Sequence, residues 1–164
     1  RAFRISDLQQ AAQATGQHFL YANLAHAQTK QDALDLGAHH YVDSKAGDVS
    51  EALQALGGVQ VVLATAANSQ AMADTVGGLL PRGQLIVVGV TPDPLPVSPL
   101  QLITPGVSIT GHPSGTARDV EDTMKFAVQS GVRARIQELP LAQAAEAYAA
   151  MDTGKARYRM VLTV

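Results

Sequence analysis

Apolar residues in this chain gather into short runs rich in Val, Ile and Leu, and longer amphipathic stretches separate these runs. Two runs, Val59–Thr65 and Gln84–Gly89, are apolar at nearly every position, which is typical of parallel strands buried on both faces. Four weaker runs predict further strands at His18–Leu24, His39–Val42, Val107–Thr110 and Tyr158–Thr163. Because strands that alternate with helices indicate βα units, the pattern predicts an α/β fold with a parallel sheet of about six strands.

The intervening stretches carry helix signals of two kinds, apolar spacing and capping residues. One predicted helix ends at Leu36 and Gly37, and another covers Asn68–Leu80 before a turn at Pro81–Gly83. A third covers Thr116–Val128, with Asp119 completing an approximate capping box, and a fourth covers Leu141–Met151 before Gly154.

The segment Thr91–Pro99 carries four of the eight prolines of the chain and predicts a loop. It follows an expected strand, and ligands of open parallel sheets bind outside the carboxyl ends of strands. Two interpretations remain open: the loop borders a binding site, or it only connects two elements.

Composition narrows the classes of function. With 164 residues, 46% of them hydrophobic and 16% charged, the chain has the size and character of a single globular domain. No apolar run approaches the roughly 20 residues that span a bilayer, so we expect no membrane role. The net charge of -2, with dispersed Lys and Arg, argues against nucleic acid as a partner. The absence of cysteine excludes disulfides and Cys-ligated zinc and fits a cytoplasmic protein, and Arg1–Leu8 lacks the apolar stretch of a secretory signal.

Histidines are the remaining candidates for chemistry. His39 and His40 are adjacent, so on a strand they point to opposite faces and cannot bind one ion together. His18 and His26 are isolated, and we expect no metal site in the chain. His112 stands in Gly-His-Pro-Ser-Gly-Thr before a capped helix; it either contacts a substrate, with Ser114 beside it, or lines a turn.

Five segments, in this order and spacing, resemble the cofactor-binding half of the medium-chain, zinc-dependent alcohol dehydrogenases. They are Leu36–Ser44, Val62–Ser69, Leu80–Val90, Gly111–Thr116 followed by Asp119, and Gly154–Leu162. The resemblance covers the chain from about Asp7 onward and implies a Rossmann-like, three-layer fold.

The resemblance also implies a nicotinamide dinucleotide, NAD or NADP, lying across the strand ends. Its nicotinamide would contact Thr65 and Ala66 on one loop and the backbone of Val88, Gly89 and Val90 on the next. Arg159 would approach the pyrophosphate, since Arg pairs with phosphate oxygens in a planar fork. The other interpretation of this arginine is an exposed residue on an edge strand.

The chain departs from the family pattern at its start. The positions of the family's Gly-x-Gly-x-x-Gly turn fall on Arg1, Phe3 and Ser6, none of which is glycine. The acidic residue that binds the ribose hydroxyls would fall near Leu24, where the candidates are Asn23 and His26. The choice between NAD and NADP therefore stays open.

Two functions follow. In the first, the chain is the cofactor-binding domain of an oxidoreductase that moves hydride between an alcohol and a carbonyl compound. Zinc and its ligands then belong to a catalytic N-terminal domain that is absent here, no residue of this chain is catalytic, and the chain alone is inactive. In the second, a non-catalytic Rossmann-like module has lost cofactor binding and serves folding or dimerisation. In either case we expect a homo-oligomer, paired along Leu102–Thr110.

Overall fold

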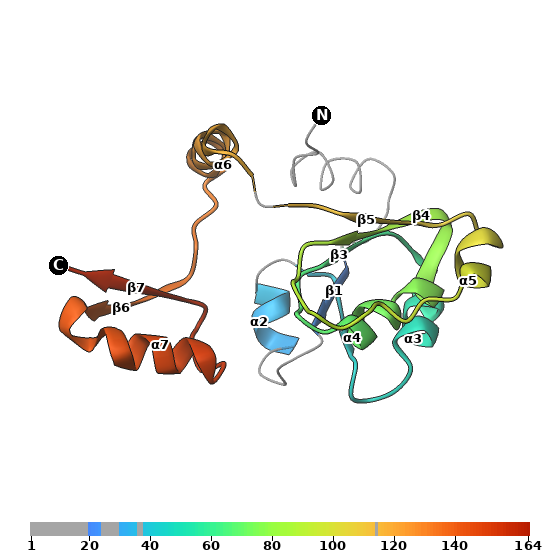
Figure 1. Ribbon diagram of the computed structural model, residues 1–164, viewed down its shortest axis with the longest axis horizontal. Coiled ribbons are helices and arrows are strands. Elements are labelled where there is room, and N and C mark those ends of the chain that lie inside the picture. Colours follow the sequence, from blue (N-terminus) through green and yellow to red (C-terminus); the bar gives the residue numbers. More distant parts are fainter. Residues whose placement is uncertain (1–19, 24–29, 36–37, 114) are drawn as a thin grey trace. The chain divides into compact units, whose positions relative to one another are not determined.

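The computed structural model describes residues 20–23, 30–35, 38–113 and 115–164 (Figure 1). They belong to two compact units, which divide between residues 114 and 115. The elements of the first unit are β1 (Leu20–Asn23), α2 (Lys30–Asp35), β2 (His40–Asp43), α3 (Val49–Ala55), β3 (Val59–Ala64), α4 (Ser69–Ala73), the 3₁₀ helix η1 (Val76–Gly78), β4 (Leu79–Val87), α5 (Pro99–Ile103) and β5 (Ser108–Gly111). Those of the second are α6 (Ala117–Ser130), β6 (Ile136–Pro140), the 3₁₀ helix η2 (Leu141–Gln143), α7 (Ala144–Asp152) and β7 (Arg159–Thr163).

All strand pairs among these residues are parallel, which confirms the α/β class. The ladders are β1–β2, β3–β4–β5 and β6–β7. Within the first unit, the described strands form a ladder of two and a ladder of three in place of one continuous sheet. An apolar run indicates that a strand is buried, but it does not identify the strand that lies beside it.

Two predicted boundaries around β4 need correction. The helix expected over Asn68–Leu80 ends at Ala73 in α4, and the turn expected at Pro81–Gly83 is part of β4. The 3₁₀ helix η1 follows, and at its Gly78 a Cβ would lie 2.5 Å from Leu53 Cδ1 of α3. Glycine lets η1 approach α3 closely, and the chain then turns directly into the strand.

The segment Pro81–Gly83 joins the strand through an irregularity rather than a turn. The pairing of β3 with β4 shifts register between Val59 and Val61, as at a β-bulge. Arg82 has a φ of 61°, the positive value that such irregular positions require. The sequence predicts a turn at these residues, whereas the structure places them inside the strand.

Side-chain caps fix several helix starts. The capping box of Thr116 and Asp119 predicted for α6 is confirmed, and this helix ends at Gly131 in the left-handed conformation, with a φ of 69°. Two helices that the sequence pattern did not predict also carry caps: Asp48 caps α3, and Ser98 with Gln101 forms a capping box at α5. β6 is likewise an unpredicted strand.

The main hydrophobic core lies on one face of the β3–β4–β5 sheet. Its buried members are Ala64, Met72, Val76, Leu79, Leu85 and Val107. Leu95 and Val97 of the proline-rich loop pack against them, together with residues of the strands and of α5. A smaller cluster of Val42, Val49 and Leu53 ties α3 to β2. This packing holds the three strands in register and thereby fixes where their carboxyl ends lie.

In the second unit, α7 packs beside the parallel pair β6–β7, with Ala147 buried at 4% exposure. The apolar side chains of α6 are largely exposed, as Val128 shows at 82%. None of the helices in the described parts of the chain has both the length and the apolar character needed to cross a membrane.

Candidate functional site

The carboxyl ends of β3, β4 and β5 lie side by side at one edge of their sheet (Figure 1). Ala64 pairs with Val87, and Val87 pairs with Gly111, so the three strands end in register. We call the residues that follow them the rim: Thr65 and Ala66 after β3, Val88, Gly89 and Val90 after β4, and His112 after β5. The structure thus brings five of the six predicted cofactor contacts together.

Backbone hydrogen bonds hold the rim in place beyond the last ladder pairs. The amides of Val88 and Gly89 both donate to the carbonyl oxygen of Ala64, at 3.0 and 2.9 Å. The amide of His112 donates to the carbonyl oxygen of Val87 at 2.9 Å. Because all three segments are tied to strand ends, the rim is pre-formed rather than loose.

Gly89 sits where two of these segments touch. A Cβ at this position would lie 2.2 Å from the carbonyl oxygen of Ala66 and 3.0 Å from Met72 Cε. Real Cβ atoms do not approach a backbone oxygen so closely, so any side chain here would push the two loops apart. Glycine is therefore required for the observed spacing between the loop after β3 and the loop after β4.

The rim combines exposed apolar side chains with a backbone carbonyl oxygen that can accept a hydrogen bond. Val90 is 86% exposed and Val88 is 38% exposed. Among donors in the described ranges, none bonds to the carbonyl oxygen of Val88. A flat apolar ring that carries an amide group suits this combination, because the ring can cover the valines while the amide pairs with the carbonyl. The residues present therefore fit the nicotinamide end of a dinucleotide.

His112 completes the rim and was left between two interpretations by the sequence. Its side chain is exposed, and its Nδ1 lies 2.8 Å from the carbonyl oxygen of Pro113. The strand register that places it beside Val88 could not be read from the sequence. The available signal was its position two residues after the predicted strand Val107–Thr110.

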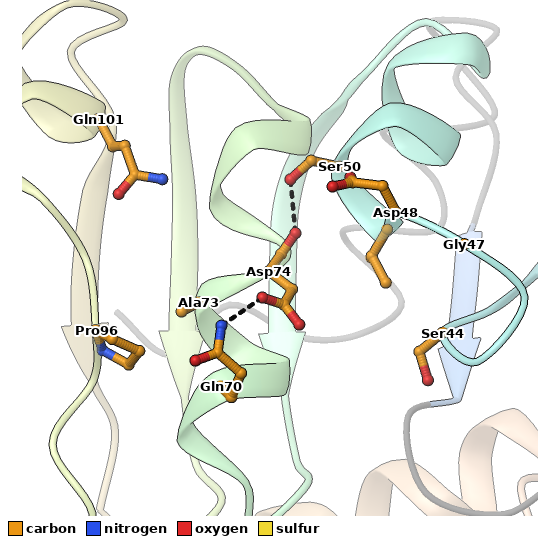
Figure 2. Close-up of a pocket in the computed structure, with 10 residues that line it drawn as sticks. Ser44, Gly47, Asp48, Ser50, Gln70, Ala73, Asp74, Pro96 and Gln101 are labelled. Atoms are coloured by element: carbon orange, nitrogen blue, oxygen red, sulfur yellow. Dashed lines mark hydrogen bonds between the residues drawn. The ribbon is translucent and has the colours of Figure 1, made fainter.

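A polar cavity of about 510 Å³ lies elsewhere in the first unit, between the start of α3, α4 and the segment around Pro96 and Gln101 (Figure 2). Ser50 Oγ donates to the carbonyl oxygen of Asp74 at 2.6 Å, and Gln70 Nε2 donates to Asp74 Oδ1 at 2.7 Å. The first bond ties α3 to the end of α4, and the second lies within α4 and its C-cap. No residue of the rim lines this cavity, and its polar groups have a structural explanation.

The proline-rich segment connects the rim to the main core, and its role at a binding site stays a prediction. It leaves the rim at Thr91 and then packs Leu95 and Val97 against the main core. Asp93 and Thr91 form a local turn, in which the Asp93 amide donates to Thr91 Oγ1 at 3.3 Å. The loop therefore begins at the candidate site and ends as part of the cover over the sheet.

Other predicted residues lie apart from the rim or outside the described ranges. Arg159 is an exposed residue of β7 in the second compact unit, and its role at a pyrophosphate stays a prediction. Arg1, Phe3, Ser6, Leu24 and His26 lie outside the described residues, as does the cap expected at Gly37.

The described part of the chain contains no cluster of side chains that could bind zinc or another metal. Within residues 20–23, 30–35, 38–113 and 115–164, no three His, Asp or Glu side chains gather at metal-binding distance, and the sequence has no cysteine. His39 and His40 both form interactions of their own.

Comparison with known proteins adds an independent line of argument. Residues 8–129 match the family model described as "Zinc-binding dehydrogenase". The alcohol dehydrogenase notN of Aspergillus sp. (strain MF297-2) is 37% identical over 132 residues, which are 80% of this chain and 39% of that protein. The alcohol dehydrogenase patD of Penicillium expansum is 37% identical over 142 residues, 86% of this chain and 42% of that protein. The chain thus spans less than half the length of these relatives.

Solved structures show the same fold. The alcohol dehydrogenase of the hyperthermophilic archaeon Aeropyrum pernix superposes with a TM-score of 0.75 at 24% sequence identity, over 96% of this chain and 46% of that one. At this identity the likeness speaks for the fold alone, a Rossmann-like α/β arrangement.

Proposed function

Because this chain belongs to the zinc-binding dehydrogenase family and corresponds to the NAD(P)-binding domain of alcohol dehydrogenase-like oxidoreductases, we propose that its rim binds the nicotinamide end of NAD(H) or NADP(H). The observation that supports the proposal most is the in-register ending of β3, β4 and β5. Three adjacent strand ends form a continuous surface, as dinucleotide sites of this fold class require.

Each part of the rim has a distinct task in this proposal. The exposed valines, Val88 and Val90, lose water contact when the ring lies on them. The carbonyl of Val88, to which no donor in the described ranges bonds, accepts a hydrogen bond from the carboxamide. Thr65 and Ala66 have small side chains that leave room for the ring and its ribose, and Gly89 keeps their loop close.

The bound nicotinamide supplies the hydride chemistry, accepting or donating hydride at an alcohol or a carbonyl compound. This chain's own contribution is to orient the ring and to exclude water from one of its faces. The rim contains no group that we assign to proton transfer or to catalytic metal binding. We therefore propose that substrate, zinc and catalysis depend on residues beyond this sequence, and that the chain alone shows no turnover.

Pairing between copies is a further part of the proposal. β5 is the last strand of its ladder, and an edge strand can pair with another chain through its free backbone groups. Ile103, just before β5, is 75% exposed. We propose a homo-oligomer joined along Leu102–Thr110, and sedimentation equilibrium of the chain would contradict it by showing only monomer.

The alternative, a module that no longer binds cofactor, is not favoured by the family match. Titration calorimetry of the whole chain with NADH, NADPH and ADP-ribose separates the two functions. Binding of NADH or NADPH, tighter than that of ADP-ribose, is expected, because ADP-ribose lacks the ring that the rim contacts. A folded chain that binds none of the three would exclude the proposal. Equal affinity for all three would show that the nicotinamide ring adds nothing to binding, and the rim would then not be its binding site.

A further inference from the structure

His112 occupies a place in the rim that its sequence context does not reveal. The strand β5 ends at Gly111, which pairs with Val87, and the His112 amide continues that pairing to the Val87 carbonyl at 2.9 Å. His112 therefore stands beside Val88 on the neighbouring strand end. Neighbouring strands lie about 4.8 Å apart, so an imidazole can reach a group that is bound at Val88.

The hydrogen bonding of the ring fixes which nitrogen can act on a ligand. Nδ1 of His112 lies 2.8 Å from the Pro113 carbonyl oxygen. A carbonyl oxygen can only accept, so Nδ1 carries the hydrogen of this bond. In the neutral ring, Nε2 is then left as a hydrogen-bond acceptor. The side chain is exposed, so this acceptor is available at the surface of the rim.

The strand register thus brings His112 beside Val88, and each of these neighbouring residues carries an acceptor, the Val88 carbonyl oxygen and His112 Nε2. A primary carboxamide carries two N–H donors on one nitrogen and can satisfy both acceptors at once. An ester, a ketone or a carboxylate in the same place offers no such pair of donors.

We propose that His112 is a specificity-determining residue, whose Nε2 accepts a hydrogen bond from the carboxamide NH₂ of the bound nicotinamide, alongside the Val88 carbonyl. This inference rests on the proposed function, because it needs the ring at the rim. It assigns His112 a ligand contact in place of a role confined to its turn.

Two substitutions separate the ligand contact from the turn. His112→Asn keeps a donor at the position of Nδ1, which can still bond to Pro113, but has no atom at the position of Nε2. His112→Gln places a polar group at the distance of Nε2 and gives up the bond to Pro113. We expect His112→Asn to weaken NADH binding about tenfold, as one unmade hydrogen bond does, and His112→Gln to stay within about threefold of the unmodified chain.

A cofactor analogue without the carboxamide tests whether the effect of the substitutions depends on that group. The 3-acetylpyridine analogue of NADH replaces the carboxamide by a ketone and so has no NH₂ to donate. We expect the unmodified chain, His112→Asn and His112→Gln to bind this analogue with equal affinity. Calorimetric titration provides every value, and none depends on turnover.

The outcomes distinguish this inference from the proposed function. If the unmodified chain binds NADH and His112→Asn binds it equally well, the ligand contact is wrong and the proposed function stands. If His112→Gln is the weaker of the two variants, the role of His112 is in the turn, and the inference is overturned as well. If the unmodified chain binds no dinucleotide, the proposed function fails and the inference fails with it.

Discussion

The two faces of the β3–β4–β5 sheet differ sharply although both are lined by aliphatic residues. On one face, Leu85 is 0% exposed and Ala64 is 5% exposed beneath α4 and the proline-rich loop. On the other, Leu63 is 53% exposed and Val61 is 39% exposed. Alternation along a strand assigns neighbouring residues to these opposite faces. The difference in burial therefore comes from what packs on the sheet and not from the residues of the strands.

This contrast bears on function because the rim stands at the end of both faces. The packed face fixes the strand register and hence the positions of the rim residues. The other face has less apolar area to bury, since Leu63 and Val61 stay partly exposed there. Substitutions on the two faces should accordingly separate the stability of the scaffold from the properties of its surface.

The largest effect is expected from a matched pair of leucines. Leu85→Ala removes a fully buried side chain and should lower the free energy of unfolding by about 2–5 kcal/mol. Leu63→Ala, on the half-exposed face, should cost about 1 kcal/mol or less. Urea unfolding followed by circular dichroism provides both values. Equal losses would mean that the two faces are packed alike and would break the comparison.

The next effect concerns the contact between the two rim loops. Gly89→Ala places a Cβ 2.2 Å from the Ala66 carbonyl oxygen, so we expect a loss of about 1–3 kcal/mol in stability and weaker NADH binding. Gly47→Ala is the matched control, because a Cβ there meets nothing within 4 Å. Thermal unfolding and calorimetric titration of both variants check the prediction, and an unchanged Gly89→Ala protein would show that the loops do not meet as described.

A smaller effect should follow from loosening the cover of the packed face. Asn68 caps α4, and its Oδ1 accepts from the Ala71 amide at 2.9 Å. Asn68→Ala should cost about 1 kcal/mol, whereas Asn68→Asp, which keeps an accepting oxygen, should cost a few tenths at most. The urea midpoints of unfolding check this prediction, and we expect the midpoint of Asn68→Ala to be the lower of the two. The reverse order would show that the side chain of Asn68 does not stabilise α4 as a cap.

The smallest effect is expected on an exposed surface of the second unit. Lys125 Nζ lies 2.6 Å from Glu121 Oε1, with side chains that are 60% and 64% exposed. Glu121→Gln should change the free energy of unfolding by about 0.5 kcal/mol or less, and the change should shrink further in high salt. A decrease in the free energy of unfolding above 1 kcal/mol that persists in high salt would contradict the prediction. It would show that this exposed surface, unlike the exposed face of the sheet, contributes substantially to stability.

Local chemistry was the part of the fold that the sequence predicted best. The strands at Val59 and Gln84 were marked by continuous apolar runs, and Thr116 with Asp119 identified the start of α6. The length predicted for α4 was wrong, and the close approach of η1 to α3 at Gly78 could not be predicted, because it involves Leu53, a residue 25 positions away in the sequence. The division into three ladders could not be predicted either, since strand partners depend on contacts between distant segments.

The candidate site was predictable only as separate segments. The loops after Thr65 and Val88 were identified through the family resemblance, and the structure places them in contact at Gly89 and Ala66. The addition of His112 required the register of β4 with β5. The role of Arg159, the organisation as a single domain, the cytoplasmic location and the homo-oligomer stay predictions.

The most direct test of the rim as a dinucleotide site is to locate the bound ligand by the backbone amide shifts of the whole, ¹⁵N-labelled chain titrated with NADH. The account predicts the largest shifts at Thr65, Ala66, Val88, Gly89 and Val90, with Ser50, Gln70 and Asp74 of the polar cavity unmoved. Shifts confined to the polar cavity, or none at saturating NADH, would contradict it.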